Sequence, residues 1–311
     1  MRTGRASALT DTGRRRMQNE DAFVCDPPLY AVADGMGGAQ AGELASRLAA
    51  ATLEERAAGL VGEETVTELI REANDRIYRH ALGDPAAAGM GTTVTALLVD
   101  EVAGTIAVGH VGDSRAYLVR DGALEQLTAD HSLVAELVRT GRLTPEEAEQ
   151  HPHRSVITRA LGTEPDVEVD TFTVAAEPGD LYLICSDGLS SMIRDDEILS
   201  VVAAAEAHPD SVAERLVDAA NRAGGEDNVT VVVFEILEGE PLPEQEAAAP
   251  EPDEPTAEAA VTVAVEEDPA AAPGHPVRRH GAGAGGRWLA LGAILLALAA
   301  AALLVWWGLA R

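Results

Sequence analysis

Residues 29–38 read LYAVADGMGG, an apolar run that ends in an aspartate followed by glycines. Similar stretches are TIAVGHVGDSR at 105–115, LYLICSDGLS at 181–190 and, with the acid before the apolar run, GGEDNVTVVVF at 224–234. Short apolar runs bounded by glycine are typical of buried β-strands. Because neighbouring strands of a sheet end side by side, we expect these acids to converge on one site.

The acids of these stretches form the candidate metal-ligand set, together with a pair that precedes the apolar segment AFVC. They are Glu20, Asp21, Asp34, Asp113, Asp187 and Asp227. Taken singly, an Asp-Gly pair usually marks a turn, and Asp121-Gly122 between YLVR and ALEQ reads as a two-residue hairpin. Several carboxylates held together repel each other and are costly to desolvate, and bound cations relieve both effects. Glycine beside an acid also lets a backbone carbonyl, such as that of Gly35, approach the ion.

The type of ligand indicates both the metal and the chemistry. Oxygen ligands without His or Cys favour Mg²⁺ or Mn²⁺ over Zn²⁺ or Cu²⁺. Two such ions can activate water and orient a phosphoryl group for in-line displacement. A nearby guanidinium, such as that of Arg16, can hold phosphate oxygens in a bidentate manner. The residues alone therefore predict metal-assisted hydrolysis of a phosphoester.

The composition of the 311-residue chain supports this direction. Its formal net charge is −29, and all 23 basic residues are arginine. The absence of lysine excludes P-loop NTPases, protein kinases and pyridoxal-phosphate enzymes, each of which needs a specific lysine. The acidity argues against nucleic acid as a partner, because phosphates would be repelled. The two cysteines, Cys25 and Cys185, lie in apolar runs and are expected to be buried thiols.

The periodicity predicts mixed strands and helices without βαβ alternation, which favours antiparallel sheets covered by helices. The expected strands are 22–25, 29–33, 92–99, 104–111, 115–120, 123–127, 167–174, 180–185 and 228–236. The expected helices are 40–58, 63–82, 132–140, 195–206 and 209–223.

The chain divides into a folded domain, 1–237, followed by three further segments. Residues 238–287 form an acidic Pro/Ala/Gly-rich stretch, expected to be a disordered linker. Residues 288–307 contain no charge and are expected to form one transmembrane helix, with 308–311 as an extracytoplasmic tail. All three tryptophans lie at the ends of 288–307, and Arg278, Arg279 and Arg287 precede it. The positive-inside rule therefore places the domain in the cytoplasm, in agreement with an N-terminus that shows no signal peptide.

Eight short motifs occur in the order and spacing of one known family. They are RMQNED, ADGMGG, GMGTTVTALL, GHVGDSRAYL, TADHS, RALG, CSDGL and GEDNVTVVV. The chain over about 4–236 resembles the metal-dependent protein phosphatases of the 2C type, and especially bacterial Ser/Thr phosphatases with a C-terminal membrane anchor. The resemblance implies an α+β fold, a four-layer α/β/β/α sandwich of two antiparallel sheets flanked by helix pairs.

The resemblance also implies the activity and the role of each site residue. It implies hydrolysis of phosphoserine and phosphothreonine by a hydroxide activated between two Mn²⁺ or Mg²⁺ ions, without a covalent intermediate. Asp34 would bridge the two metals, and the Gly35 carbonyl would bind one of them. Asp187 and Asp227 would complete the first metal site. Glu20 and Asp21 would serve the second, and Asp113 would join Asp187 at a third, weaker ion. Arg16 would bind the substrate phosphate, with Arg14 and Arg15 as rivals on spacing alone.

One position departs from the animal members of this family, which carry a histidine, often assigned as general acid, where this chain has Met36. A thioether cannot donate a proton, so the identity of the acid stays open. His131, His151 and His153 are poor substitutes, the last two in a segment (133–160) expected to form a mobile flap. Ser114 and Ser186 have no histidine in motif spacing, which argues against a covalent intermediate.

Two other functions compete with the phosphatase. One is a catalytically inactive phosphoprotein-binding module at the membrane, for which six acids would be unnecessary. The other is a different two-metal hydrolase, such as a phosphodiesterase or nuclease, which the domain's charge of −22 disfavours. For the phosphatase, the expected partners are phosphorylated proteins, among them membrane Ser/Thr kinases and their substrates, and the catalytic domain is expected to be monomeric.

Overall fold

The computed structural model describes residues 1–239 except 38–40, 58, 60 and 206–210. The predicted linker beyond 239, the transmembrane segment 288–307 and the tail 308–311 lie outside the described residues. Within the described part, no helix is both long and apolar enough to cross a membrane.

Eleven strands are described in this part of the chain: β1 (Arg2–Asp11), β2 (Asp21–Asp26), β3 (Leu29–Met36), β4 (Gly91–Thr92), β5 (Val94–Asp100), β6 (Thr105–Val111), β7 (Arg115–Arg120), β8 (Ala123–Gln126), β9 (Asp170–Ala175), β10 (Leu181–Cys185) and β11 (Val229–Leu237). The described helices are α1 (Ala41–Arg56), α2 (Glu63–Gly83), η1 (Pro85–Ala87), α3 (Leu133–Arg139), α4 (Pro145–Glu149), α5 (Asp187–Ser190), α6 (Asp195–Ala205) and α7 (Val212–Ala223).

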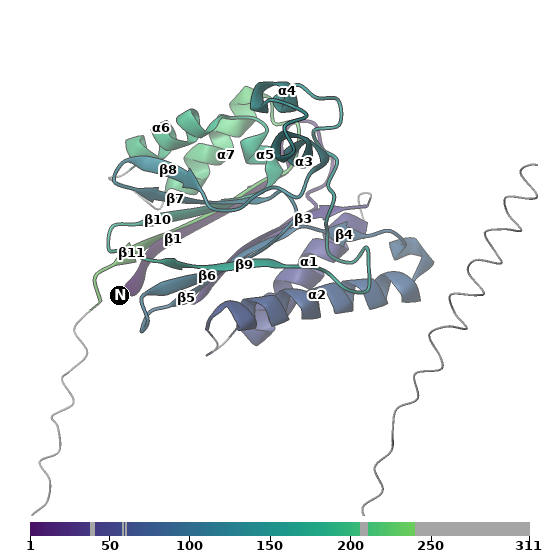
Figure 1. Ribbon diagram of the computed structural model, residues 1–311, viewed down its shortest axis with the longest axis horizontal. Coiled ribbons are helices and arrows are strands. Elements are labelled where there is room, and N and C mark those ends of the chain that lie inside the picture. The colour runs from purple at the N-terminus through teal and green to yellow at the C-terminus, as the bar shows by residue number, and fades with distance from the viewer. Residues whose placement is uncertain (38–40, 58, 60, 206–210, 240–311) are drawn as a thin grey trace, which may run out of the picture. The chain divides into compact units, whose positions relative to one another are not determined.

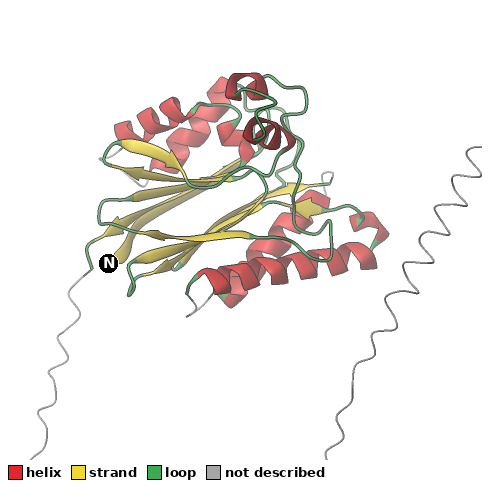
Figure 2. Ribbon diagram, viewed as in Figure 1, coloured by secondary structure: helices red, strands yellow, loops and turns green. Residues whose placement is uncertain are grey.

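The strands form two antiparallel sheets that face each other (Figure 2). The first sheet has the order β1-β11-β10-β7-β8, and the second has the order β2-β3-β5-β6-β9 with β4 added to β3. Helices α5, α6 and α7 lie over the first sheet, and α1 and α2 cover the second (Figure 1). The expected α/β/β/α sandwich is thereby confirmed.

The alternation of side chains along β11 explains the layering. Val231 and Val233 pack against α5–α7, whereas Val232 and Phe234 point to the opposite face and pack against the second sheet. Successive residues of a strand face opposite sides, so a strand buried on both sides is apolar throughout. The ring of Phe234 stacks on Tyr30 of the other sheet with centroids 3.9 Å apart. The core therefore lies in three layers, one between the sheets and one under each helix group.

Two local features test the sequence expectations directly. Asp121 and Gly122 connect β7 to β8 with φ angles of 51° and 74°, the left-handed conformations that a tight hairpin turn requires. The hairpin prediction is confirmed. Strand β1 was not expected, because its residues alternate weakly and stay partly exposed; it pairs with β11 at the edge of the first sheet. Short helices α4 and α5 were also missed.

Candidate active site

The predicted acids gather at one end of the sandwich, where strands of both sheets begin or end. Asp34 lies near the end of β3 and is the direct cross-strand partner of Asp21 at the start of β2. Asp113 follows β6 by two residues, Asp187 follows β10, and Asp227 precedes β11. Like charges directly opposite each other on paired strands are destabilising. The Asp21–Asp34 pairing therefore indicates a feature that selection for stability alone would not produce.

The burial of these acids changes their pKa values. Burial, reinforced by neighbouring carboxylates, raises the pKa of Asp21 and of Asp113 to about 7 and that of Asp187 to about 6. Burial, with Asp21 and Asp187 next, also raises the pKa of Asp34 far above its ordinary value. The pKa of Glu20 is raised by burial, an effect that Arg16 partly offsets. Divalent cations would reverse these shifts, since opposite charge stabilises the ionised form.

One oxygen of Asp21 is held while the other is left without a partner. The hydroxyls of Ser186, directly after β10, and of Thr230 in β11 donate to Asp21 Oδ2 at 2.8 and 2.6 Å. Asp21 Oδ1 is buried and has no hydrogen-bond partner, and the same is true of Asp113 Oδ1. Buried carboxylate oxygens are rarely unsatisfied, and a metal ion or its water is one explanation. These donors therefore fit a hard cation such as Mg²⁺ or Mn²⁺.

The predicted ligands do not, however, form a complete metal site in this structure. Among the described residues, no three His, Cys, Asp or Glu side chains form a group that could hold a metal ion as they stand. Asp227 is instead engaged by Arg16, whose Nη2 lies 2.6 Å from Asp227 Oδ2. The acids are thus neighbours at one end of the sandwich rather than a preformed cage.

The loop that carries Arg16 is tied to the loop before β11. Arg14 donates its backbone N–H to the Gly225 carbonyl, and Asn228 donates to the carbonyls of Thr12 and Gln18. Asn228 Oδ1 also accepts from the Glu20 backbone N–H. The loop that carries Arg16 is therefore held in place by hydrogen bonds to the loop before β11. Of the three adjacent arginines, Arg16 is the one with a described ion pair to a site acid.

Gly35 allows the close packing of this region. A Cβ on Gly35 would lie 2.2 Å from the Gly42 carbonyl oxygen and 2.5 Å from that of Glu20. Its N–H donates to the Glu20 carbonyl at 3.2 Å. Only glycine lets β3, the start of α1 and Glu20 meet this closely.

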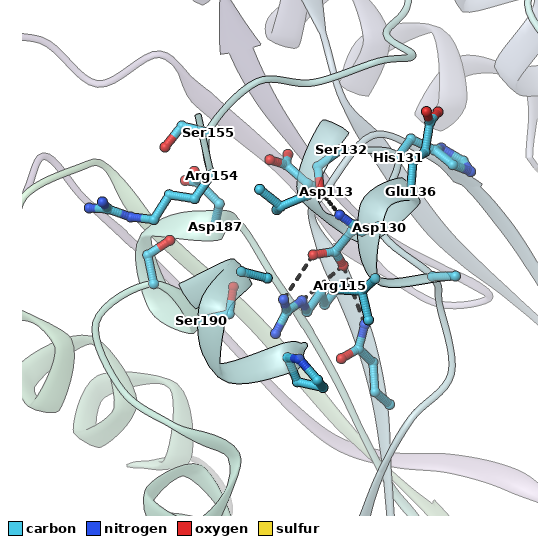
Figure 3. A pocket seen from close by; sticks show the side chains of 18 of the residues that line it. Asp113, Arg115, Asp130, His131, Ser132, Glu136, Arg154, Ser155, Asp187 and Ser190 are labelled. Atoms are coloured by element: carbon cyan, nitrogen blue, oxygen red, sulfur yellow. Dashed lines mark hydrogen bonds and ion pairs between the residues drawn. The ribbon is translucent and has the colours of Figure 1, made fainter. Parts of the chain in front are cut away.

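A cavity of about 1280 Å³ opens beside the acids. Asp113 and Asp187 border it, along with α3, α4 and the chain to Arg159, which correspond to the predicted flap (133–160). Figure 3 shows Asp113, Asp187 and Arg154 among the lining side chains, with the two bonds from Arg115 to Asp130 dashed. The site therefore has room for a protein segment next to the carboxylates.

Comparison with known proteins places this geometry in a family. A profile of the protein phosphatase 2C family matches residues 13–227. The chain belongs to the protein phosphatase 2C family. It is similar to the serine/threonine phosphatase Stp of Listeria welshimeri, 41% identical over 242 residues, covering 74% of this chain and 95% of that protein.

Two further similarities concern phosphatases named PstP. The Mycobacterium tuberculosis protein is 43% identical over 237 residues, covering 75% of this chain but 45% of that protein. The chain thus spans less than half the length of that relative. A crystal structure of a PstP catalytic domain in complex with two manganese ions matches with a TM-score of 0.69 and 40% identity, covering 75% of this chain and 98% of that chain.

Within this 2C domain, the residues first considered as acids or nucleophiles have other partners. Met36 ends β3 beside Gly91 of β4. The Ser114 hydroxyl bonds to Thr93, and that of Ser186 to Asp21. His151 Nδ1 accepts from the His153 backbone N–H in the exposed segment after α4. Both cysteines are free thiols: Cys185 is buried as expected, whereas the expectation was wrong for Cys25, which is only partly buried near the end of β2.

The sequence did not reveal the residues that orient the acids. Ser186 and Thr230, which hold Asp21, and Asn228, which ties the loops, came to light only in the structure. The one available signal was their position inside the motifs CSDGL and GEDNVTVVV, next to Asp187 and Asp227.

Proposed function

We propose that this chain is a Mn²⁺- or Mg²⁺-dependent protein phosphatase that hydrolyses phosphoserine and phosphothreonine monoesters. The observation that carries the proposal is the group of buried carboxylates from both sheets, two of which leave an oxygen without a partner. Membership of the 2C family and the printed names of its relatives support the same activity.

We propose the following division of the metal site. Asp34 would serve both ions and the Gly35 carbonyl one of them, with Asp187 and Asp227 on the first ion, and Glu20 and Asp21 on the second. Asp113 would hold a third, weaker ion with Asp187. When bound, the ions supply an activated water as the nucleophile and neutralise charge on the phosphoryl oxygens.

The chain's own residues position the substrate. Arg16, whose side chain is half exposed at the site, exchanges its bond with Asp227 for the phosphate oxygens, a bidentate interaction that guanidinium geometry favours. Ser186 and Thr230 keep Asp21 in one orientation. The cavity beside Asp113 and Asp187 receives the polypeptide that flanks the phosphorylated residue. Because Met36 cannot donate a proton, the leaving group would take its proton from metal-bound water or from another donor.

The test uses the full chain and a phosphothreonine peptide, with and without Mn²⁺. We expect metal-dependent release of phosphate, and loss of turnover by about 10³-fold or more in Asp187→Asn, because the metal site would be incomplete. Asp121→Asn is a matched control: it alters an Asp-Gly pair that lies in a hairpin turn, which accepts asparagine.

Two outcomes would overturn this function. Binding of the phosphopeptide without release of phosphate would indicate a binding module. Cleavage of DNA or cyclic nucleotides in preference to the peptide would indicate a phosphodiesterase or nuclease. Full Mn²⁺-dependent activity in Asp187→Asn would refute the assignment of the site.

We further propose that residues 288–307 anchor the protein in the cell membrane, with the domain in the cytoplasm, monomeric, and acting on membrane Ser/Thr kinases and their substrates. The support is the uncharged length of the segment with its tryptophans and preceding arginines. Deletion of 288–311 should move the protein from the membrane to the soluble fraction of a bacterial host. An unchanged distribution would contradict the anchor.

A further inference from the structure

His131, in the motif TADHS, has contacts that the proposed chemistry does not use. Its side chain is 9% exposed, and its Nδ1 accepts a hydrogen bond of 3.0 Å from the Gly112 backbone N–H. Its own backbone N–H donates to the Gly112 carbonyl at 2.7 Å. Gly112 directly precedes Asp113. His131 therefore holds the turn before Asp113 through two hydrogen bonds, one to the N–H and one to the carbonyl of Gly112.

The turn has little freedom on its other side. Gly112 has a φ of +116°, and a Cβ there would lie 2.5 Å from the Cβ of Thr93. The hydroxyl of Thr93 in turn bonds to Ser114, the residue after Asp113. The position of Asp113, with its unpartnered Oδ1, is therefore set by Thr93 and His131 together.

The second nitrogen of His131 faces the cavity wall. Because Nδ1 accepts from an N–H group, a neutral ring carries its proton on Nε2, which lies 3.2 Å from Asp170 Oδ2 and 3.0 Å from Arg159 Nη1. Arg159 donates to Asp170 Oδ1 at 2.5 Å, and both residues line the 1280 Å³ cavity. One imidazole thus bonds to the Asp113 turn through Nδ1 and to the Arg159–Asp170 pair through Nε2; the ring is labelled in Figure 3.

We propose that His131 is a positioning residue that fixes the Asp113 turn for metal binding and links it to the Arg159–Asp170 pair on the wall of the substrate cavity. The inference rests on the proposed function, because it assigns His131 a part in that site. A histidine is suited to this place because its rigid ring offers an acceptor and a donor on two different nitrogens. Residues that orient the ligands of a metal contribute to its affinity without touching it.

Two substitutions separate the two hydrogen bonds. In His131→Asn the amide oxygen takes the place of Nδ1, so the bond from Gly112 is kept and the bond to Asp170 is lost. In His131→Gln the amide nitrogen takes the place of Nε2, so the bond to Asp170 is kept and the bond from Gly112 is lost. His110→Asn is the control for loss of a buried imidazole beside His131: its ring centroid lies 4.7 Å from that of His131, but it bonds to Thr95 and the Ala129 carbonyl rather than to Gly112.

The measurements are Mn²⁺ binding to the metal-free full chain by calorimetry, kcat and KM for a phosphothreonine peptide, and Tm. We expect His131→Gln to weaken binding of the third Mn²⁺ ion, the one assigned to Asp113, by about 10-fold or more. We expect His131→Asn to keep Mn²⁺ affinity within about 2-fold and to raise KM by roughly 5-fold, as loss of one hydrogen bond of about 1 kcal/mol would.

The proposal is overturned if both His131 variants keep wild-type Mn²⁺ affinity and KM. It is also overturned if both His131 variants change Mn²⁺ affinity and KM equally, and by no more than His110→Asn changes them at a similar fall in Tm. If the wild-type chain binds Mn²⁺ but releases no phosphate, the proposed function fails, whereas the contrast in Mn²⁺ affinity between the two variants still decides the role of His131.

Discussion

Without divalent cations, the domain should lose stability as the pH rises from 5 to 8. The cause is the raised pKa of its buried acids, about 7 for Asp21 and Asp113 and about 6 for Asp187. An acid whose pKa is higher in the folded than in the unfolded protein favours folding while it is protonated, below the unfolded pKa near 4. That contribution is lost as the pH rises through the folded pKa, because the buried group must then ionise.

The size of the effect follows from one residue. Asp21, with a folded pKa of about 7 against an ordinary 3.8, lowers the free energy of unfolding by about 2–3 kcal/mol between pH 5 and pH 8. For a domain of this size that is roughly 5–10 °C in Tm. Asp113 and Asp187 add to the loss, although less than independently, because each ionisation opposes the next.

The assay is thermal unfolding of the full chain at pH 5, 6, 7 and 8, in EDTA and in Mn²⁺. Asp21→Asn is the control, since an asparagine keeps an oxygen for Ser186 and Thr230 but cannot ionise. In EDTA this variant should show a shallower fall in Tm and exceed the wild type at pH 8, while gaining less from Mn²⁺. A wild-type Tm in EDTA that stays level or rises over this range would refute the reasoning.

Arg16→Ala should raise KM for a phosphopeptide by about 10-fold, through loss of a charge-assisted contact, and leave Mn²⁺ affinity equal or higher because Asp227 is released; weaker Mn²⁺ binding would contradict this. Gly112→Ala should cost about 2–3 kcal/mol in urea unfolding, because φ is positive and Thr93 blocks the Cβ; a neutral result would show that the turn relaxes. Asp180→Ala, at the opposite end of β10, should cost about 3 kcal/mol by stripping Arg120 of its buried partner, with Mn²⁺ affinity unchanged; reduced affinity would show that the two ends are coupled.

Much of the fold was predictable because both faces of the central strands are buried. In β11 and β3 this burial makes most of the strand sequence apolar. The hairpin at Asp121-Gly122 was predictable because aspartate and glycine tolerate positive φ. Strand β1 escaped prediction because it is an edge strand with one partner, β11, and partly exposed side chains. Its pairing is set by a contact between the two ends of the domain that local sequence cannot express.

The candidate site was also predictable only in part. The acids were identifiable because each follows or precedes a strand next to glycine or within a recognisable motif. The residues that orient the acids were not identifiable, because Ser186 after β10 and Thr230 in β11 contact Asp21 from more than 160 positions away along the chain. Nor could the sequence show that Arg16 is held by Asp227.

The pairing of β1 with β11 joins Arg2 to Leu237, the first and the last strand of the domain. During synthesis, the first sheet therefore stays incomplete until β11 has emerged from the ribosome, and Thr230 reaches Asp21 only at that stage. Contacts this distant in sequence also slow folding. A nascent or truncated chain without β11 would then lack both the completed sheet and the orienting hydroxyl, so the proposed metal site could not be completed before the domain is finished.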